Sequence, residues 1–393
     1  MRRRTFLLRS AGLAASWCPA TRFAPAQTWS PKVLEFVRGR QEQEYNHLAD
    51  LLGLGTAKNS YNKIANRPMP SDLKQEYGSA PLPTPFEDPY MYPIMTKTFE
   101  GLSQENNALS RPALPHPFLA TLPSGDVNAG TEEVHETKTP VVFFEQGLFS
   151  FFYDMAKLMA WAAPPLTDRQ LTDDAALAAI GNSYTIPPQG AEYFAATLSA
   201  YALSGSPVAE STPIPEPRLN IGLSKSLLNH MVRFVMLHEL AHVQAQDYEN
   251  PRQTPEREYN ADEAAVSLVT TLAGKYHGSW ALGYWGCDLA LVALNFLYRS
   301  VALLTYGGKK LNWVSPTHPD PLSRRAKLRG MWRNPFSPEA GVAAAGMVTR
   351  MTEKLLQILW EDTDWILLLR YQQGLRASPR WRKTAKSFAA RDA

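Results

Sequence analysis

At 393 residues, 45% of them hydrophobic and 20% charged, the chain is long enough for one large core or two moderate ones, and its composition excludes a disordered or collagen-like protein. The 40 basic and 37 acidic residues leave a net charge of +3, too small for the footprint of a nucleic-acid-binding protein. We therefore expect a globular protein that does not bind nucleic acid.

The first 26 residues have the features of a twin-arginine export signal. Three arginines, Arg2 to Arg4, precede a short apolar run, and Ala24–Ala26 supplies a small-x-small cleavage site. We therefore expect a mature protein in the periplasm, exported in the folded state. Cys18 lies within the signal and Cys287 outside it, so the mature chain is expected to form no internal disulfide.

Residues 27–139 form the first predicted region of the mature chain, a helical arm followed by a proline-rich extended segment. Apolar residues recur at helical spacing from Pro31 to Leu54, which predicts an amphipathic helix. Eleven of the 31 prolines lie between Pro68 and Pro123, and because proline removes an amide donor, this density predicts extended chain without long helices. The polar stretch from Gly125 to Lys138 is the expected boundary.

Residues 140–335 form the second predicted region, an α+β body that is mostly helical and has a small sheet. The expected elements, in chain order, are a strand at Pro140–Phe144, helices at Phe149–Trp161 and Asp173–Ile180, a strand at Ser183–Ile186, a helix at Ala191–Leu203, a strand at Leu219–Leu223, and helices at Ser226–Ala245 and Ala281–Tyr306. The helix at Ser226–Ala245 is apolar nearly all round, which indicates a core helix.

Two further segments complete this outline. The run Leu289–Leu304 is near the lower length limit of a membrane span, but it contains Asn295 and Arg299, and a charged residue within a span is costly. We therefore favour a buried helix over membrane association.

Residues 336–393 are predicted to form additional C-terminal helices, starting near Glu339, and a basic, solvated tail.

The most informative pattern is an HExxH motif at residues 238–242, inside the predicted core helix. Residues four apart share one face of a helix, so His238 and His242 can place two imidazole nitrogens on one metal ion. Glu239 then stands beside a water on that metal, and its carboxylate can accept the water's proton. These residues predict a zinc-dependent hydrolase with one Zn²⁺ per chain.

The third protein ligand is expected from the acidic pair Glu258 and Asp262. These residues are also four apart, so Glu258 can bind zinc while Asp262 accepts a hydrogen bond from a ligand histidine. Two alternatives stay open. Asp262 or Glu263 would reach the zinc in place of Glu258, or the same side chains would form a buried polar network without metal.

Three stretches resemble the HtpX and CAAX-prenyl-protease family of gluzincin metallopeptidases. Glu256–Asp262 is similar to the family's Arg-Glu-Tyr-x-Ala-Asp signature, Thr317–Leu328 to its Thr-His-Pro-Pro-Leu element, and Leu219–Leu228 to its strand before the zinc helix. The resemblance implies a gluzincin-like core and a metalloendopeptidase. It implies the zinc ligands His238, His242 and Glu258, the base Glu239, and Asp262 hydrogen-bonded behind a ligand.

The spacing of the two motifs supplies a second resemblance. Fifteen residues separate His242 from Glu258, fewer than in HtpX and closer to thermolysin-like gluzincins. This short step and the Phe143–Phe149 region are similar to the phage-exclusion Lit-type peptidases.

Residues beyond the two motifs have open roles. His318 is a candidate catalytic donor to the oxyanion of the tetrahedral intermediate, or else the histidine of a structural His-Pro turn. Arg324 and Arg325 are candidates to pair with Asp262 or with substrate carboxylates, or they lie in solvent.

The predicted function is a zinc-dependent endopeptidase acting on protein or peptide substrates of the cell envelope. The strand expected before the motif helix would then dock the substrate as an added strand. The alternative is an envelope binding or quality-control protein with a vestigial or structural metal site. The sequence indicates no oligomeric state and no cleavage preference.

Overall fold

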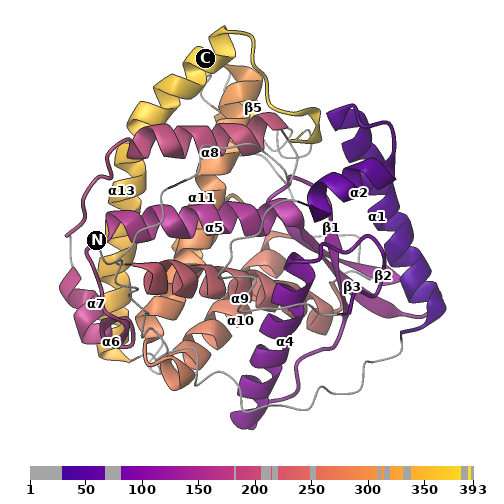
Figure 1. The fold of residues 1–393 in the computed structure, drawn as a ribbon. Helices are drawn as coiled ribbons and strands as arrows, with labels where there is room; N and C mark the ends of the chain where they lie inside the picture. The colour runs from indigo at the N-terminus through magenta and orange to yellow at the C-terminus, as the bar shows by residue number, and fades with distance from the viewer. Residues whose placement is uncertain are drawn as a thin grey trace, which may run out of the picture.

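The computed structural model describes residues 29–66, 81–180, 183–204, 214, 220–247, 254–307, 311–313, 319–330, 338–381 and 388–390. Most of them are helical, and a small mixed sheet lies at one side, so the expected α+β, mostly helical class is confirmed (Figure 1). The export signal predicted over residues 1–26 lies outside the described residues.

The helices divide into N-terminal, central and C-terminal sets. The N-terminal and sheet-flanking helices are α1 (Pro31–Leu52), α2 (Ala57–Ala65), α4 (Met91–Ala108) and α5 (Gln146–Ala162). The central ones are α6 (Asp168–Leu171), α7 (Asp174–Ile180), α8 (Gly190–Ser204), α9 (Ile221–Ala245), α10 (Pro255–Tyr276) and α11 (Trp280–Tyr306). The last are α12 (Pro321–Gly330), α13 (Glu339–Gln372) and the 3₁₀ turn η4 (Pro379–Trp381).

Within the part of the chain that the structure describes, the main sheet has three strands in the order β1-β3-β2. Its strands are β1 (Phe118–Leu122), β2 (Ala129–Val134) and β3 (Thr139–Glu145), and β1 runs parallel and β2 antiparallel to the central β3. A separate antiparallel pair joins β4 (Leu311–Trp313) and β5 (Phe388–Ala390). Among the described residues, β1 and β2 are therefore the edge strands of the main sheet.

Both faces of the main sheet are covered, because its side chains alternate between two apolar clusters. Phe118, Val141 and Phe143 join Val33 and Val37 of α1 in one cluster. The intervening side chains, Leu119, Val142 and Phe144, belong to the large core formed with the helices. Successive strand residues point to opposite faces, so the sheet is a layer between α1 and the helical body (Figure 1).

The helical body is built around α9 and α11, which pack against each other and against α10, and α11 also packs against α13. A Cβ on Gly286 of α11 would collide with the Cβ of His230 on α9, so glycine permits this close approach. Among the described residues, α11 alone has the length and apolar character of a membrane span, yet 83% of its most apolar window is buried inside the protein. The predicted buried helix is confirmed.

The proline-rich segment differs from the prediction of extended chain. Met91–Ala108 forms the 18-residue helix α4, with Pro93 in its first turn. The first amides of a helix have no intrahelical acceptor, so a proline there sacrifices no hydrogen bond. The strand β3 starts at Thr139, one residue before the predicted start of the second region at Pro140, and pairs with β1 and β2, which precede that start in the sequence.

Two predicted strands are wrong in their described parts. Ile221–Leu223 is the first turn of α9, where Gly222 approaches α6 so closely that a Cβ would lie 2.9 Å from Asp168 Oδ1. Residues 183–187 form no strand, and Ile186 is exposed to solvent. Tertiary packing of α9 on α6 outweighs the strand propensity of the first segment.

The other helix predictions within the described residues are confirmed within a few residues. The helix predicted at Ser226–Ala245 is longer, starting at Ile221, and the C-terminal helix starts at Glu339 as expected. Asn220 fixes the start of α9, since its side-chain amide donates to Ala160 O at 2.7 Å and its Oδ1 accepts from Leu166 N at 2.9 Å. The motif helix is thereby tied to the end of α5.

Candidate metal centre

The HExxH motif lies in the last two turns of α9, against the core. His238 and Glu239 are 7% and 6% exposed, although both are polar. The helix ends at Gln246, whose left-handed φ of 54° turns the chain back. Burying a polar side chain costs free energy unless the side chain has hydrogen-bonding or charged partners, so His238 and Glu239 need such partners.

The second motif is carried by α10, which packs along α9. Thr254 precedes Pro255 at the first helical position, a favourable place for proline. Glu258 lies in the first turn, where the helix dipole favours negative charge, and Asp262 lies one turn further on the same face. Both carboxylates are buried against α9.

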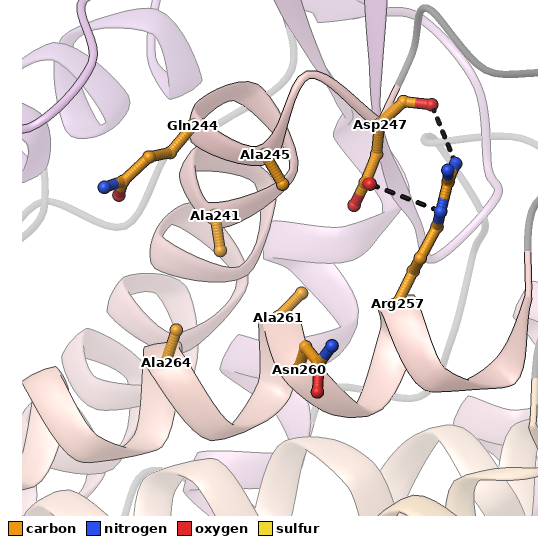
Figure 2. A pocket seen from close by; sticks show the side chains of 8 residues that line it. All are labelled: Ala241, Gln244, Ala245, Asp247, Arg257, Asn260, Ala261 and Ala264. Atoms are coloured by element: carbon orange, nitrogen blue, oxygen red, sulfur yellow. Dashed lines mark hydrogen bonds and ion pairs between the residues drawn. The ribbon is translucent and has the colours of Figure 1, made fainter.

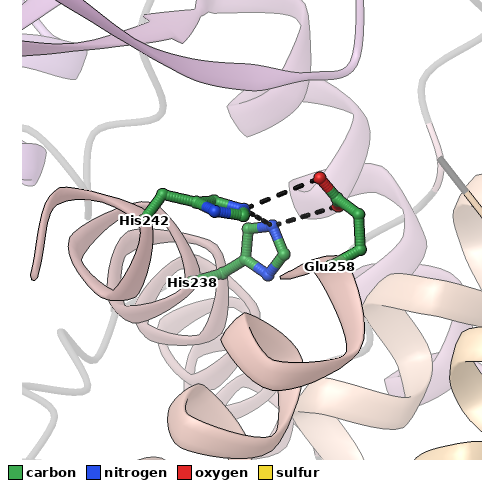
Figure 3. Close-up of side chains that lie close together, drawn as sticks. All are labelled: His238, His242 and Glu258. Atoms are coloured by element: carbon green, nitrogen blue, oxygen red, sulfur yellow. Dashed lines mark hydrogen bonds and ion pairs between the residues drawn. The ribbon is translucent and has the colours of Figure 1, made fainter. Parts of the chain in front are cut away.

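Three side chains converge on one point, as Figure 3 shows. The Nε2 atoms of His238 and His242 are 3.1 Å apart. The Glu258 oxygens lie 3.5 Å from His238 Nε2 and 3.7 Å from His242 Nε2. Ligands about 2.0–2.1 Å from a tetrahedral metal are about 3.3 Å from one another, so the three groups have the spacing of metal ligands.

Each of the two imidazoles has a carboxylate next to its Nδ1 atom, on the side opposite Nε2. Asp262 Oδ1 lies 2.9 Å from His238 Nδ1, and Asp247 Oδ2 lies 2.8 Å from His242 Nδ1. With Nδ1–H donated to a carboxylate, each Nε2 keeps its lone pair toward the shared point. Asp262 was predicted in this role. Asp247 was not predicted in this role. The sequence feature that could have indicated it is its position, five residues after the second histidine of the motif.

Arg257 fixes Asp247 from the other side. Its Nε lies 3.4 Å from Asp247 Oδ1, and its Nη1 donates to the Asp247 carbonyl at 3.2 Å (Figure 2). The pair closes one end of a pocket of about 280 Å³ between α9 and α10, lined mainly by small side chains. Since Glu239 and the three converging side chains do not line this pocket, it lies beside the centre and does not contain it.

The helix α12 supplies two adjacent arginines that point to different helices. Arg324 donates hydrogen bonds to both oxygens of Asp262 on α10, at 2.7 and 2.6 Å. Arg325 grips both oxygens of the buried Asp288 on α11 at 2.6 and 2.7 Å. Such bidentate pairs are short and geometrically specific, so α12 is held against both helices. Of the pairings considered for Arg324, the one with Asp262 is observed.

The surrounding charges favour a cation at the centre. Burial would raise the pKa of Asp262, but the Arg324 guanidinium outweighs it and holds that pKa below its ordinary value. Burial would lower the pKa of His238, but hydrogen bonds to Asp262 and Glu258 outweigh it and raise that pKa to about 9. The centre thus attracts positive charge even onto an imidazole.

The formal charges of the side chains around the centre also favour a bound cation. Among the described residues, the carboxylates are Glu239, Asp247, Glu258 and Asp262, and the guanidiniums that pair with them are those of Arg257 and Arg324. With both imidazoles neutral, as metal ligands must be, four negative and two positive charges leave two negative charges, which a divalent cation would neutralise. The donor set therefore fits a divalent metal ion with two imidazole nitrogens and one carboxylate.

Glu239 does not belong to the converging set and has a different partner. Its Oε2 accepts a hydrogen bond of 2.9 Å from the hydroxyl of Thr131 on β2. The carboxylate thus lies between the motif helix and an edge strand of the sheet. Thr131 was also missed, because 108 residues separate it from Glu239.

The structure places the other predicted site residues differently. Glu263, the alternative ligand, is exposed on α10, and the converging carboxylate is that of Glu258. His318 lies outside the described residues. Tyr298 of α11 is a neighbour that the sequence did not reveal: burial raises its pKa to about 12, and the charges of Arg324 and Glu258 both act on it.

A helix-borne pair of histidines, a carboxylate from the next helix and a separate glutamate define a candidate hydrolytic metal centre. Comparison with known families agrees: residues 191–331 match the model of the family described as Peptidase U49, the Lit-type phage-exclusion peptidases. The matched stretch runs from α8 to α12 and contains both motifs. No curated protein and no solved structure gives a significant match.

The family match supports a peptidase function and bears on the two resemblances unequally. It agrees with the similarity to Lit-type peptidases and gives no support to HtpX or CAAX-protease identity.

Proposed function

We propose that this protein is a zinc-dependent endopeptidase. The observation that carries the proposal is the convergence of His238, His242 and Glu258 beside Glu239, within the stretch that matches a peptidase family. Two imidazole nitrogens and one carboxylate are a donor set that zinc accepts, and three protein ligands leave a fourth position for water or substrate. Each chain would hold one zinc ion.

The chemistry divides between the metal and the chain. A bound zinc ion would lower the pKa of its water to about 7 and polarise the scissile carbonyl. Glu239 accepts the proton that the water loses as its oxygen attacks the carbonyl carbon, and then delivers that proton to the leaving amine as the C–N bond breaks. Asp262 and Asp247 hold the two imidazoles with Nε2 toward the metal.

The oxyanion of the tetrahedral intermediate needs a donor as well. We propose His318 for this role, because Thr317-His318-Pro319 immediately precedes α12, the helix that carries Arg324 to the centre. Replacing His318 by Ala should lower kcat by about 10²-fold without loss of zinc. Unchanged kcat in a zinc-loaded variant would exclude the role.

The docking strand expected before α9 is helical, so another edge must receive the substrate. The edge strand beside the centre is β2, since its Thr131 contacts Glu239. An extended substrate segment added to this edge would gain main-chain hydrogen bonds without depending on sequence. We therefore propose unfolded or extended protein segments as substrates.

The cellular setting follows from the sequence alone. The twin-arginine pattern of residues 1–26 supports a periplasmic location and envelope substrates. Replacing Arg3 and Arg4 by Lys should retain the protein in the cytoplasm, as judged by cell fractionation, and unchanged export would contradict this part of the proposal.

The test combines metal content with cleavage of an unfolded protein. The purified protein should contain one zinc per chain, and a chelator should remove cleavage that added zinc restores. Glu239→Gln should lower kcat by about 10²–10⁴-fold while zinc content stays unchanged. Glu263→Gln, an exposed glutamate on α10, is the matched control and should cleave like the wild type.

Two outcomes would count against the proposal. Zinc-loaded wild-type protein that binds peptides without cutting them would favour the alternative, a binding or quality-control protein. Full activity of Glu239→Gln would refute the assignment of the base.

A further inference from the structure

Thr131 links the edge of the sheet to Glu239. Its hydroxyl donates to Glu239 Oε2 at 2.9 Å, and the accepting side chain is only 6% exposed. A hydrogen bond to an ionised carboxylate is about twice as strong as one between neutral groups. In a site with little water around it, this bond fixes which way the carboxylate faces.

The register of β2 gives the same residue a second property. Glu145 N donates to Asn128 O at 3.1 Å, so residues 128 and 145 form a hydrogen-bonded pair of the antiparallel ladder. Such pairs alternate with non-hydrogen-bonded ones, and Thr131, opposite Val142, falls in the second class. The main-chain N–H and C=O of Thr131 therefore point away from β3, toward the side of β2 on which the described residues form no further strand.

We propose that Thr131 is the positioning residue that couples substrate docking to the base. This inference rests on the proposed peptidase function. The main chain of Thr131 pairs with the substrate strand, while its hydroxyl holds Oε2 of Glu239 and leaves Oε1 to receive the proton of the attacking water. The hydroxyl keeps its own proton throughout, so the only proton transferred is that of the water.

Steady-state kinetics can distinguish the two roles of Thr131, the main-chain pairing with substrate and the hydrogen bond from its hydroxyl to Glu239. Thr131→Val keeps the main chain and the branched shape of the side chain but removes the donor. The KM for an unfolded protein substrate should stay within about twofold, while kcat should fall by about tenfold or more, the effect of one hydrogen bond to a charged group. Thr131→Ser restores the hydroxyl and should recover most of kcat.

A matched control comes from the neighbouring strand. Thr139 begins β3 in the same sheet, and its hydroxyl donates to the Thr137 carbonyl and not to Glu239. Thr139→Val makes the same chemical change outside the centre, so kcat and KM should equal those of the wild type. Zinc content should be equal in all variants.

A second readout does not depend on activity. In chelator-treated protein, a double-mutant cycle between Thr131→Val and Glu239→Ala measures the coupling of the two side chains through urea unfolding. Thr131→Val should change the unfolding equilibrium constant by about tenfold in the wild-type background and by much less once Glu239 is Ala. The same cycle with Thr139→Val should show no coupling.

The outcomes separate this inference from the function on which it rests. Chelator-sensitive cleavage by the wild type together with unchanged kcat in Thr131→Val, or a cycle without coupling, would overturn the role of Thr131. Zinc-loaded wild-type protein without any cleavage would instead overturn the peptidase function, and the catalytic role of Thr131 with it.

Discussion

The residues around His238 and those at the end of β3 both place carboxylates against the core, but the pKa values of these carboxylates shift in opposite directions. At the candidate metal centre, Asp262 is gripped by Arg324 and its pKa lies below the ordinary value. At the end of β3, Glu145 accepts a hydrogen bond from Ser124, and burial beside Asp126 raises its pKa to about 8. The shift favours the ionised form of Asp262 and the protonated form of Glu145.

The two carboxylates differ in their partners, a guanidinium for Asp262 and a hydroxyl for Glu145, and also in burial, since Asp262 is buried and Glu145 is half-buried. A guanidinium in direct contact offsets the cost of burying a negative charge, whereas a hydroxyl offsets only part of it. The buried Glu87, whose hydrogen-bond donors Gln41 and Thr121 are neutral, shows the same upward shift, to a pKa of about 7. The pKa values of the carboxylates thus lie below the ordinary value where a guanidinium pairs with them, as at Asp262 and Glu105.

The largest effect should come from removing the charge of Asp262. Asp262→Asn leaves Arg324 buried without a full counter-charge and weakens the hold on His238, so the free energy of unfolding should fall by about 3 kcal/mol. Zinc affinity should also fall by about 10–100-fold. Urea unfolding in chelator and competition with a zinc-binding dye would measure the two quantities.

The matched control is Asp288→Asn, which breaks the equivalent bidentate pair with Arg325 away from the centre. It should lose a similar free energy of unfolding and keep wild-type zinc affinity. If both variants lost zinc affinity equally, the effect of Asp262 would be one of general stability, and the contrast between the two regions would disappear.

An intermediate effect is expected from Glu145→Gln, and it depends on pH. The folded-state pKa of Glu145, about 8, lies above the ordinary 4.5, so wild-type stability from this group is fully present below about pH 4.5 and is lost as pH rises through about 8. Gln cannot ionise. The variant should match the wild type near pH 4 and exceed it by on the order of 2 kcal/mol near pH 9.

Urea titrations of metal-free protein at several pH values would test this, with the exposed Glu136→Gln as control. A constant difference between Glu145→Gln and the wild type from pH 4 to 9 would show that Glu145 is already ionised in the folded protein.

The smallest effect is expected for Asp247→Asn. The side chain would still accept from His242 Nδ1 but without a negative charge, so zinc affinity should fall by about tenfold. Asp247 is partly exposed, and Arg257 would keep its bond to the Asp247 carbonyl, so the unfolding free energy should change by less than about 1 kcal/mol. A dye-competition titration measures the first quantity, and unaltered affinity would remove Asp247 from the centre.

Contacts fixed by the spacing of residues within one helix could be predicted from the sequence, and contacts that depend on how the chain folds back could not. His238, His242, Glu258 and Asp262 were found because a spacing of four fixes neighbours on a helix. Asp247 was not found because it lies beyond Gln246, whose left-handed conformation leaves the helical path. Thr131 could not be found, because its approach to Glu239 depends on how the sheet packs on α9.

The same distinction explains the errors in secondary structure. Pro93 was taken as a helix breaker, but its effect depends on the position within the helix, and the first turn tolerates it. The segment Ile221–Leu223 reads as a strand by composition, yet Gly222 packs against α6 and Asn220 ties the helix start to α5. In both cases a contact or a boundary outside the local pattern decided the structure.

The hairpin of β2 and β3 has a consequence for how the protein tolerates insertions. Its turn is set by Lys138, with φ of 54°, whose amide donates to the Val134 carbonyl at 2.8 Å. Side chains of a strand alternate between faces, so one extra residue in this turn that shifted β2 by one position would move the Thr131 hydroxyl to the opposite face. A surface loop remote from the histidines thus has its length constrained by Glu239.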